Sequence, residues 1–160
     1  MERPPRRELA TFSGGCFWDL EAAFRHQRGV LATVAGYTGG SVPDPDYELV
    51  ASGTTGHAEA VQVAFDPDLV TYNALLDIFW NSHDPVQPPA GSERSAIYYH
   101  SQEQEEQALA SRDWVQESLG ERVVTTVILP VQEFWRAEEC HQQYYEKCGR
   151  GYGTAPKYWE

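Results

Sequence analysis

Apolar and polar residues alternate over several short stretches of the chain, which predicts β-strands. The clearest alternation runs over EAVQVAFD, where every second residue is a large apolar side chain. Similar patterns predict further strands at ELATFS, VLATVAGYTGG, SAIYYH and RVVTTVIL, the last of them closed by Pro130. The Gly39-Gly40 pair ends the second of these strands, and a loop rich in proline, aspartate and glycine follows it over residues 41–56.

Between the strands, apolar residues recur at spacings of three and four, which predicts helices. The predicted helices cover residues 16–27, 71–82, 101–119 and 137–147, with a single helical turn at 47–52. Thr71 and Ser101 are suitable N-caps, and Gly29 and Gly120 are suitable ends.

The resulting order, roughly βαββαβαβα, predicts an α+β fold. We expect a two-layer α/β sandwich in which helices pack on a mixed sheet with a ferredoxin-like core. The length of 160 residues suits one domain, 1–160, with an irregular C-terminal arm at about 148–160.

Composition narrows the possible partners. Lysine and arginine total 12 against 24 acidic residues, a formal net charge of −12. Phosphate-bearing partners would be repelled, so we expect neither nucleic acid nor an anionic membrane to bind. No apolar stretch is long enough to span a bilayer, and the basic N-terminus lacks the apolar run of a secretory signal. Three cysteines are too few for a disulfide scaffold, and the number is odd, so we expect a protein of the reducing cytoplasm. We also expect it to be a monomer.

The stretch SGGCFWDL places Cys16 at the start of the first helix, after two glycines. Helix N-terminal amides stabilise a thiolate, so we expect the pKa of this thiol to be lowered and its sulfur to be nucleophilic. Gly14 and Gly15 would let backbone amides and a substrate approach closely. The alternative is a buried cysteine acting as a small apolar residue.

Phe17 and Trp18 occupy adjacent helical positions and cannot face the same way. Beside a nucleophilic sulfur they could form an apolar pocket for a methyl or thioether group; alternatively, one is core and the other is surface. Glu59 begins an apolar strand, where burial would raise its pKa and allow it to act as an acid, although a solvated glutamate is common there. We expect His57 to hold its loop by hydrogen bonds.

Cys140, His141 and Cys148 could be zinc ligands, but zinc sites have four ligands as a rule, so we expect no metal. Cys140 would face the helix core with Phe134 and Tyr144. Cys148 has basic neighbours in a glycine-rich segment, and it is therefore the better redox thiol.

Several motifs in a fixed order resemble the peptide-methionine (S)-S-oxide reductases, the A-type methionine sulfoxide reductases. They are GGCFW, GYTGG, DPDYELV, SGTTGHAEAVQVAFDP, FWNSHDP, RSAIYYH and AEECHQQYYEK. The resemblance runs from Ala10 to about Tyr152. It implies reduction of methionine S-sulfoxide, free or in oxidised proteins, and no metal or organic cofactor.

The resemblance also implies roles for five residues. Cys16 would attack the sulfoxide sulfur and become a sulfenic acid. Phe17 and Trp18 would hold the substrate's S-methyl group. Glu59 would protonate the sulfoxide oxygen so that it leaves as water, and Tyr47 would hydrogen-bond the same oxygen. A second thiol would then form a disulfide, which thioredoxin or a similar dithiol would reduce.

Two departures from the family pattern bear on these roles. Many members carry a cysteine where Gly153 stands here, so we expect Cys148 to resolve the sulfenic acid, with Cys140 as second choice. The family usually has an aspartate and a tyrosine before the RSAI strand; here the loop has no aspartate, and Glu93 takes the tyrosine's place. Glu93 or Tyr152 could substitute, or the remaining oxygen-binding groups suffice.

Two other functions are open on the sequence alone. A degenerate family member could bind methionine or its sulfoxide without turnover. A cysteine hydrolase could use Cys16 with His57 or His141 as its base, although two aromatic rings beside the sulfur would crowd an acyl group.

Overall fold

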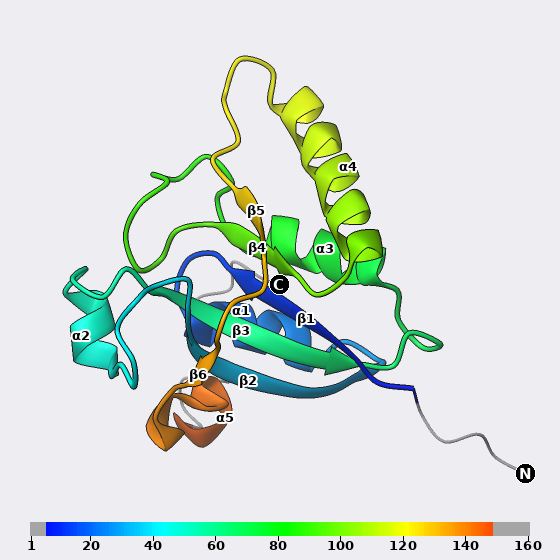
Figure 1. Cartoon of the computed structure of the whole chain (residues 1–160). Helices are drawn as coiled ribbons and strands as arrows, with labels where there is room; N and C mark the ends of the chain where they lie inside the picture. The colour runs from blue at the N-terminus through cyan, green and yellow to red at the C-terminus, as the bar shows by residue number, and fades with distance from the viewer. Residues whose placement is uncertain (1–5, 149–160) are drawn as a thin grey trace, which may run out of the picture.

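Six strands form one mixed sheet in a computed structural model of the protein, which describes residues 6–148 (Figure 1). The spatial order is β5-β4-β1-β3-β2-β6, and every neighbouring pair is antiparallel except β4 and β5, which are parallel. The strands are β1 (Glu8–Ser13), β2 (Val30–Thr38), β3 (Ala58–Phe65), β4 (Ala96–Tyr99), β5 (Val127–Pro130) and β6 (Trp135–Arg136).

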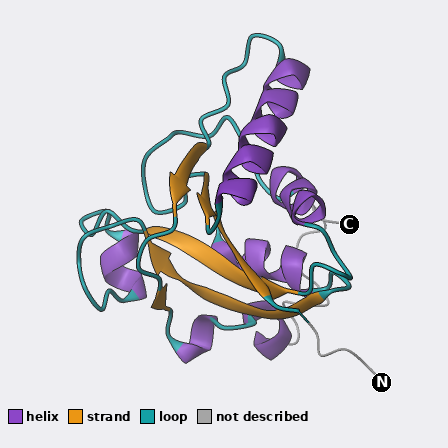
Figure 2. Cartoon of the chain, turned by 45° about the vertical axis from the view of Figure 1, so that its right-hand side comes forward, coloured by secondary structure: helices purple, strands orange, loops and turns teal. Residues whose placement is uncertain are grey.

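The helices lie mainly on one side of this sheet, with α1 behind the central strands (Figures 1 and 2). They are α1 (Phe17–Arg25), α2 (Tyr47–Ala51), α3 (Tyr72–Asn81), α4 (Gln102–Leu119), the 3₁₀ turn η1 (Glu139–His141) and α5 (Tyr144–Cys148). The order β4-β1-β3-β2, with α1 and α3 as the crossovers, is the ferredoxin-like arrangement. The predicted α+β fold is therefore confirmed, while the extent of the domain over 1–160 stays a prediction.

Aromatic side chains fill the space between α1, α3 and the sheet. Phe12 of β1 stacks on Phe24 and Phe79, with ring centroids 4.9 and 5.2 Å apart, and all three side chains are fully buried. The predicted caps are confirmed: the Thr71 and Ser101 hydroxyls accept amide hydrogen bonds at the starts of α3 and α4. This packing fixes α1, and therefore the residues at its N-terminus, against the centre of the sheet.

The strand predicted over residues 122–129 is wrong in its first half, because β5 begins only at Val127. The Thr125 amide donates to the Pro85 carbonyl at 2.9 Å, and its hydroxyl donates to the Gln87 carbonyl at 2.5 Å. The segment therefore bonds to the 85–95 loop before it joins the sheet.

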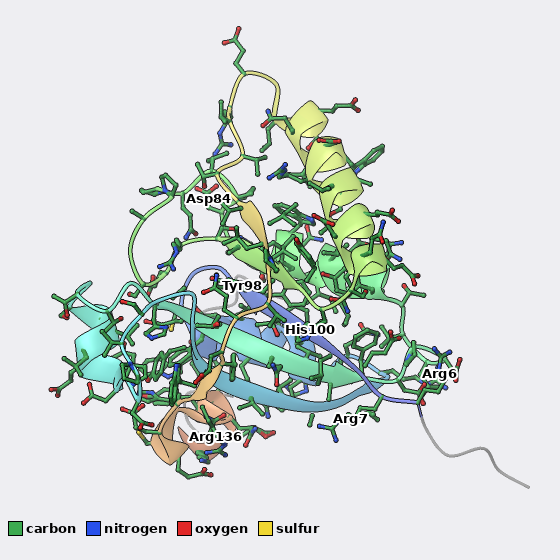
Figure 3. The ribbon with its side chains drawn as sticks, in the orientation of Figure 1. Arg6, Arg7, Asp84, Tyr98, His100 and Arg136 are labelled. Carbon is green, nitrogen blue, oxygen red and sulfur yellow. The ribbon has the colours of Figure 1, made fainter. Side chains whose placement is uncertain are left out.

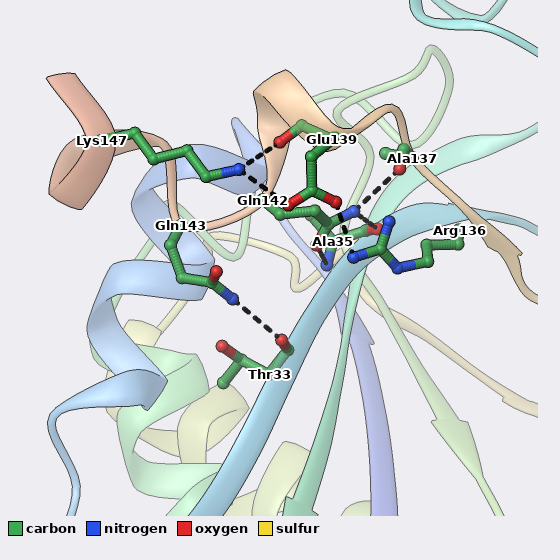
Figure 4. A network of polar contacts seen from close by, with 8 residues as sticks. All are labelled: Thr33, Ala35, Arg136, Ala137, Glu139, Gln142, Gln143 and Lys147. Carbon is green, nitrogen blue, oxygen red and sulfur yellow. Dashed lines mark hydrogen bonds and ion pairs between the residues drawn. The ribbon is translucent and has the colours of Figure 1, made fainter.

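The helix predicted over residues 137–147 is also wrong, since it divides into η1 and α5. The buried Gln142 carboxamide accepts from the Ala35 amide at 2.8 Å and donates to the carbonyls of Ala35 and Ala137 at 2.8 and 2.9 Å (Figure 4). Gln143 then adopts a left-handed conformation with φ of 47°. These bonds hold the segment on β2 and interrupt the helix between η1 and α5.

The edges of the molecule carry exposed charges. Figure 3 shows Arg6 and Arg7 where the described chain enters β1, and Arg136 at the end of β6. Arg6 pairs with Asp68 at 3.3 Å. Within residues 6–148, no helix combines the length and the apolar character that crossing a bilayer requires.

Candidate active site

Cys16 is the N-cap residue of α1, one residue after the β1-to-α1 turn. Its backbone is extended, with φ of −72° and ψ of 131°, and its carbonyl accepts the amides of Asp19 and Leu20 at 3.1 and 3.2 Å. Gly15, with φ of +73°, makes the turn that aims the following residue at the helix axis. The predicted position of the thiol at the helix N-terminus is confirmed.

Gly14 has a different function from the one we predicted. A Cβ atom at this position would lie 2.8–2.9 Å from the imidazole ring of His83. That ring is held in place by the Ser95 hydroxyl, 2.7 Å from Nε2. The missing side chain therefore makes room for a histidine of the protein rather than for a substrate.

The Cys16 thiol lies close to two carboxyl groups. Its Sγ atom, a carboxylate oxygen of Glu59 and a carboxylate oxygen of Glu93 all lie within 4.8 Å of one another. Glu59 is on β3 and only 2% exposed, whereas Glu93 is exposed at the end of the 85–95 loop. The site thus combines a thiol with one buried and one solvated carboxyl group.

Backbone hydrogen bonds hold these elements together. The Gly15 amide donates to the Glu93 carbonyl at 3.0 Å, and the Glu59 amide donates to the Ser92 carbonyl at 2.7 Å. The Glu59 carboxylate in turn accepts the Phe17 amide at 3.1 Å. The carboxyl groups are therefore positioned by the main chain of the turn that carries Cys16.

Burial raises the pKa of Glu59 to about 7, and the negative charges of Glu93 and Asp19 add to the rise. The hydrogen bond from the Phe17 amide opposes it. The predicted rise in the pKa of Glu59 is confirmed. With its pKa raised to about 7, the protonated form of this side chain is accessible at neutral pH, so it can donate a proton there.

The predicted fall in the thiol pKa is wrong. Burial raises the pKa of Cys16 to about 12, and the charges of Glu59, Asp19 and Glu93 act in the same direction. Only the hydrogen bond from the Trp18 amide lowers it. In the substrate-free protein the sulfur is therefore a protonated thiol, and its proton must be accepted by another group when it attacks.

Phe17 and Trp18 do point to different surroundings. Phe17 is fully buried, with Tyr47 and His141 ring centroids 6.1 and 5.5 Å away. Trp18 is half-buried and stacks on Tyr144 at 3.7 Å, while its Nε1 donates to His141 Nδ1 at 3.0 Å. Phe17, Trp18, Tyr47, His141 and Tyr144 therefore form one aromatic cluster that begins directly after Cys16 in the chain.

Tyr47 begins α2 and stacks on His141 at 4.5 Å. Burial and the charges of Glu59 and Cys16 raise the pKa of its phenol. Glu138 supports this position by accepting the Tyr47 amide at 3.0 Å and the Tyr37 hydroxyl at 2.7 Å. Sequence reasoning missed Glu138, because no local pattern marks a glutamate whose partners lie about a hundred positions earlier.

Both histidines considered as a hydrolase base are engaged in hydrogen bonds. The His57 Nδ1 atom accepts the Gly40 amide at 3.0 Å, and the His57 Nε2 atom bonds to the Val42 carbonyl at 2.7 Å. His57 therefore holds its loop, as predicted. His141 accepts the Trp18 indole, and burial lowers its pKa.

Cys140 is exposed on η1, so its predicted place in a helix core is wrong. The inward positions of that turn belong to His141 and Gln142. Cys148 is the last residue of α5, but its side chain, like Tyr152 and Gly153, lies outside the described residues.

The thiol and two carboxylates are also donors that a divalent cation could accept. Within residues 6–148 they form the one group of three such donors close enough to share an ion. Structural zinc sites use four protein ligands, and this group supplies three.

Comparison with known proteins agrees with this geometry. A sequence model of the family "Peptide methionine sulfoxide reductase" matches residues 8–158. The peptide methionine sulfoxide reductase MsrA of Methanosarcina mazei is 51% identical over 149 residues, covering 89% of this chain and 71% of the relative.

Solved structures extend the likeness to the fold. Mxr1 of Saccharomyces cerevisiae in reduced form has a TM-score of 0.84 and 30% identity, covering 95% of this chain and 91% of Mxr1. Mxr1 in complex with Trx2 has a TM-score of 0.65 and 26% identity, covering 90% and 89%. With a match over nearly its whole length and half of its residues shared with a curated relative, the chain belongs to the peptide methionine sulfoxide reductase family.

Proposed function

We propose that this protein reduces methionine S-sulfoxide, free or in oxidised proteins, to methionine, and so repairs oxidative damage. The observation that carries the proposal is the meeting of the Cys16 sulfur with the carboxyl group of Glu59, whose pKa is about 7, within 4.8 Å. A nucleophilic sulfur beside a proton donor is what removal of an oxygen from sulfur requires.

In the first step the Cys16 sulfur attacks the sulfoxide sulfur while Glu59 donates its proton to the sulfoxide oxygen. The Tyr47 hydroxyl donates a hydrogen bond to the same oxygen. With a second proton, which comes from the Cys16 thiol, the oxygen leaves as water. Water then adds to Cys16, giving a sulfenic acid and methionine. Cys16 loses two electrons and the substrate sulfur gains them.

Phe17 and Trp18 provide the apolar side of the substrate site and receive the S-methyl group, since sulfur and methyl groups pack well on aromatic rings. Trp18 is half-buried, whereas Phe17 is fully buried. Contact of substrate with the Phe17 ring therefore requires a neighbouring ring, Tyr47 or His141, to shift.

The sulfenic acid then condenses with a second thiol to give a disulfide and water. Cys148 is the first choice for this resolving thiol and Cys140, exposed on η1, is the second. A thioredoxin reduces the disulfide by exchange, and the structure of Mxr1 in complex with Trx2 supports this class of partner. A reducing compartment such as the cytoplasm, where we place the protein, keeps these thiols available.

The central test measures methionine formed from each epimer of methionine sulfoxide with dithiothreitol as reductant. We expect turnover of the S epimer and none of the R epimer. Cys16→Ser should abolish the reaction, and Glu59→Gln should slow the first step by roughly a hundredfold. Activity in the Cys16→Ser protein would refute the assigned nucleophile, and binding without turnover in the wild type would favour the degenerate binder.

A second experiment identifies the resolving thiol. The reduced protein receives one equivalent of methionine S-sulfoxide, and its disulfides are located by peptide mapping. Cys148→Ser and Cys140→Ser are matched variants, because each removes one candidate only. Because the chain has three cysteines, Cys148→Ser should lose the disulfide to Cys16 and Cys140→Ser should keep it. If the wild type forms no disulfide to Cys16, the assignment of either residue fails.

A further inference from the structure

The chemistry proposed above needs two protons on the departing oxygen, one of which comes from Glu59. The other is the proton of the Cys16 thiol, which burial and three nearby carboxylates hold on the sulfur. Attack by that sulfur therefore requires a group that takes its proton away.

Glu93 is placed to receive this proton. Its carboxylate oxygen, the Cys16 sulfur and the Glu59 carboxylate lie within 4.8 Å of one another, a separation that one bridging water or a small rotation of an exposed side chain closes. The bond from the Gly15 amide to the Glu93 carbonyl ties its backbone directly to the turn before Cys16.

The two carboxyl groups lie in different surroundings. Glu59 is 2% exposed and already accepts the Phe17 amide, whereas Glu93 is exposed to solvent. When two carboxyl groups lie in such contrasting environments, one can act as the acid and the other as the base. Burial favours the neutral form of Glu59, whereas the Glu93 side chain is open to water.

An ionised carboxylate accepts hydrogen bonds and donates none. Glu93 stands where the family resemblance places a tyrosine, whose phenol would donate to the sulfoxide oxygen. A carboxylate facing that oxygen, which is itself partly negative, would be repelled. The position is therefore suited to the thiol side of the reaction.

We propose that Glu93 is a catalytic base that accepts the Cys16 thiol proton, while Glu59 acts as the acid at the sulfoxide oxygen. This inference rests on the reductase function. As the bond between the two sulfurs forms, the thiol proton moves to Glu93 and the Glu59 proton moves to the oxygen.

Once protonated, Glu93 is neutral and carries an O–H donor, so it can pass this proton to the hydroxyl, which leaves as water. When water adds to Cys16, the bond between the sulfurs breaks with its electron pair on methionine, and the released proton restores Glu59. Both carboxyl groups end as they began, and the net reaction is thiol plus sulfoxide giving sulfenic acid plus sulfide.

Other charged groups face this position. Asp19 and Tyr47 act on the same cluster electrostatically. Arg94, next in the chain, donates from its guanidinium to the carbonyls of Gly56 and Gly91 at 2.7 and 3.0 Å. Removing the Glu93 charge therefore alters the cluster without releasing a salt bridge seen among the described residues.

The test measures the first turnover, with enzyme in excess over methionine S-sulfoxide and no added reductant, from pH 5.5 to 9. Glu93→Gln keeps the size and removes the base, and we expect it to slow methionine release by roughly ten- to a hundredfold. Glu106→Gln, an exposed glutamate of α4, is the matched control and should behave as wild type.

Chemical rescue distinguishes a catalytic role of Glu93 as a base from a purely structural role. Added acetate should restore a concentration-dependent fraction of the rate to Glu93→Ala, because the exposed position admits a small carboxylate, whereas chloride at equal ionic strength should not. A Glu93→Gln rate within twofold of wild type, or a slow Glu93→Ala protein that acetate does not rescue, overturns the proposal. Failure of the wild type itself, or activity in Cys16→Ser, would instead overturn the reductase function.

Discussion

Replacing Glu59 by glutamine should stabilise the folded protein at pH 8 much more than at pH 5. The buried carboxyl group has a pKa of about 7, against 4.5 for an ordinary glutamate. The folded protein therefore binds more protons than the unfolded chain between these values, and its stability falls as pH rises through them. Glutamine has no charge to bury, and its carboxamide oxygen can still accept the Phe17 amide.

The size of the effect follows from the two pKa values. The contribution of Glu59 is fully present below pH 4.5 and is lost as pH rises to about 7. From pH 5 to pH 8 this amounts to roughly 2 to 3 kcal/mol in the free energy of unfolding. Because Glu59 is 2% exposed, solvent screens little of it.

Urea unfolding of wild type and Glu59→Gln at pH 5, 6.5 and 8 measures the effect as a difference between proteins, so the titration of groups far from Glu59 cancels. Glu106→Gln, exposed on α4, should show no such trend. A stability difference that stays constant across these pH values would refute the raised pKa of Glu59, and with it the choice of this group as an acid at neutral pH.

Three further predictions concern the surroundings of the site. Gly14→Ala should lower the free energy of unfolding by about 1–3 kcal/mol, measured by urea titration, since its Cβ would press on the His83 ring. Glu138→Gln should raise the KM for methionine sulfoxide by roughly threefold to tenfold, because a carboxamide has one acceptor oxygen for the two bonds that hold Tyr47 and Tyr37. The wild-type first-turnover rate should fall about tenfold for each pH unit above 8, as the acid form of Glu59 is lost.

The elements that follow from local rules were predictable from the sequence. The alternation over β3, the caps of α3 and α4 and the glycine after α4 depend only on neighbouring residues. The predictions failed where distant partners decide the local structure. Gln142 interrupts its helix to bond to Ala35, 107 positions earlier, and Thr125 bonds to the 85–95 loop instead of a strand.

The residues of the site fall into the same two groups, those marked by local sequence and those placed by distant contacts. A short motif identifies Cys16 and its helix, and an apolar strand identifies Glu59 as a carboxyl group with a raised pKa. The side-chain position of Glu93 has no local signature, because the backbone bond from Gly15 crosses from one loop to another. The supporting contact between Tyr37 and Glu138 spans 101 positions and is equally hidden.

The contrast between local sequence and distant partners also explains why the helix N-terminus does not lower the pKa of the thiol. Its stabilisation of a negative charge is worth at most about 2 kcal/mol. A rise in the pKa of Cys16 from 9.0 to about 12 corresponds to about 4 kcal/mol in the opposite sense. Burial and the charges of Glu59, Asp19 and Glu93 therefore outweigh the helix. A thiol protonated at rest is a poor target for oxidants, and it becomes a nucleophile only when a base removes its proton, so the reactivity of Cys16 depends on Glu93.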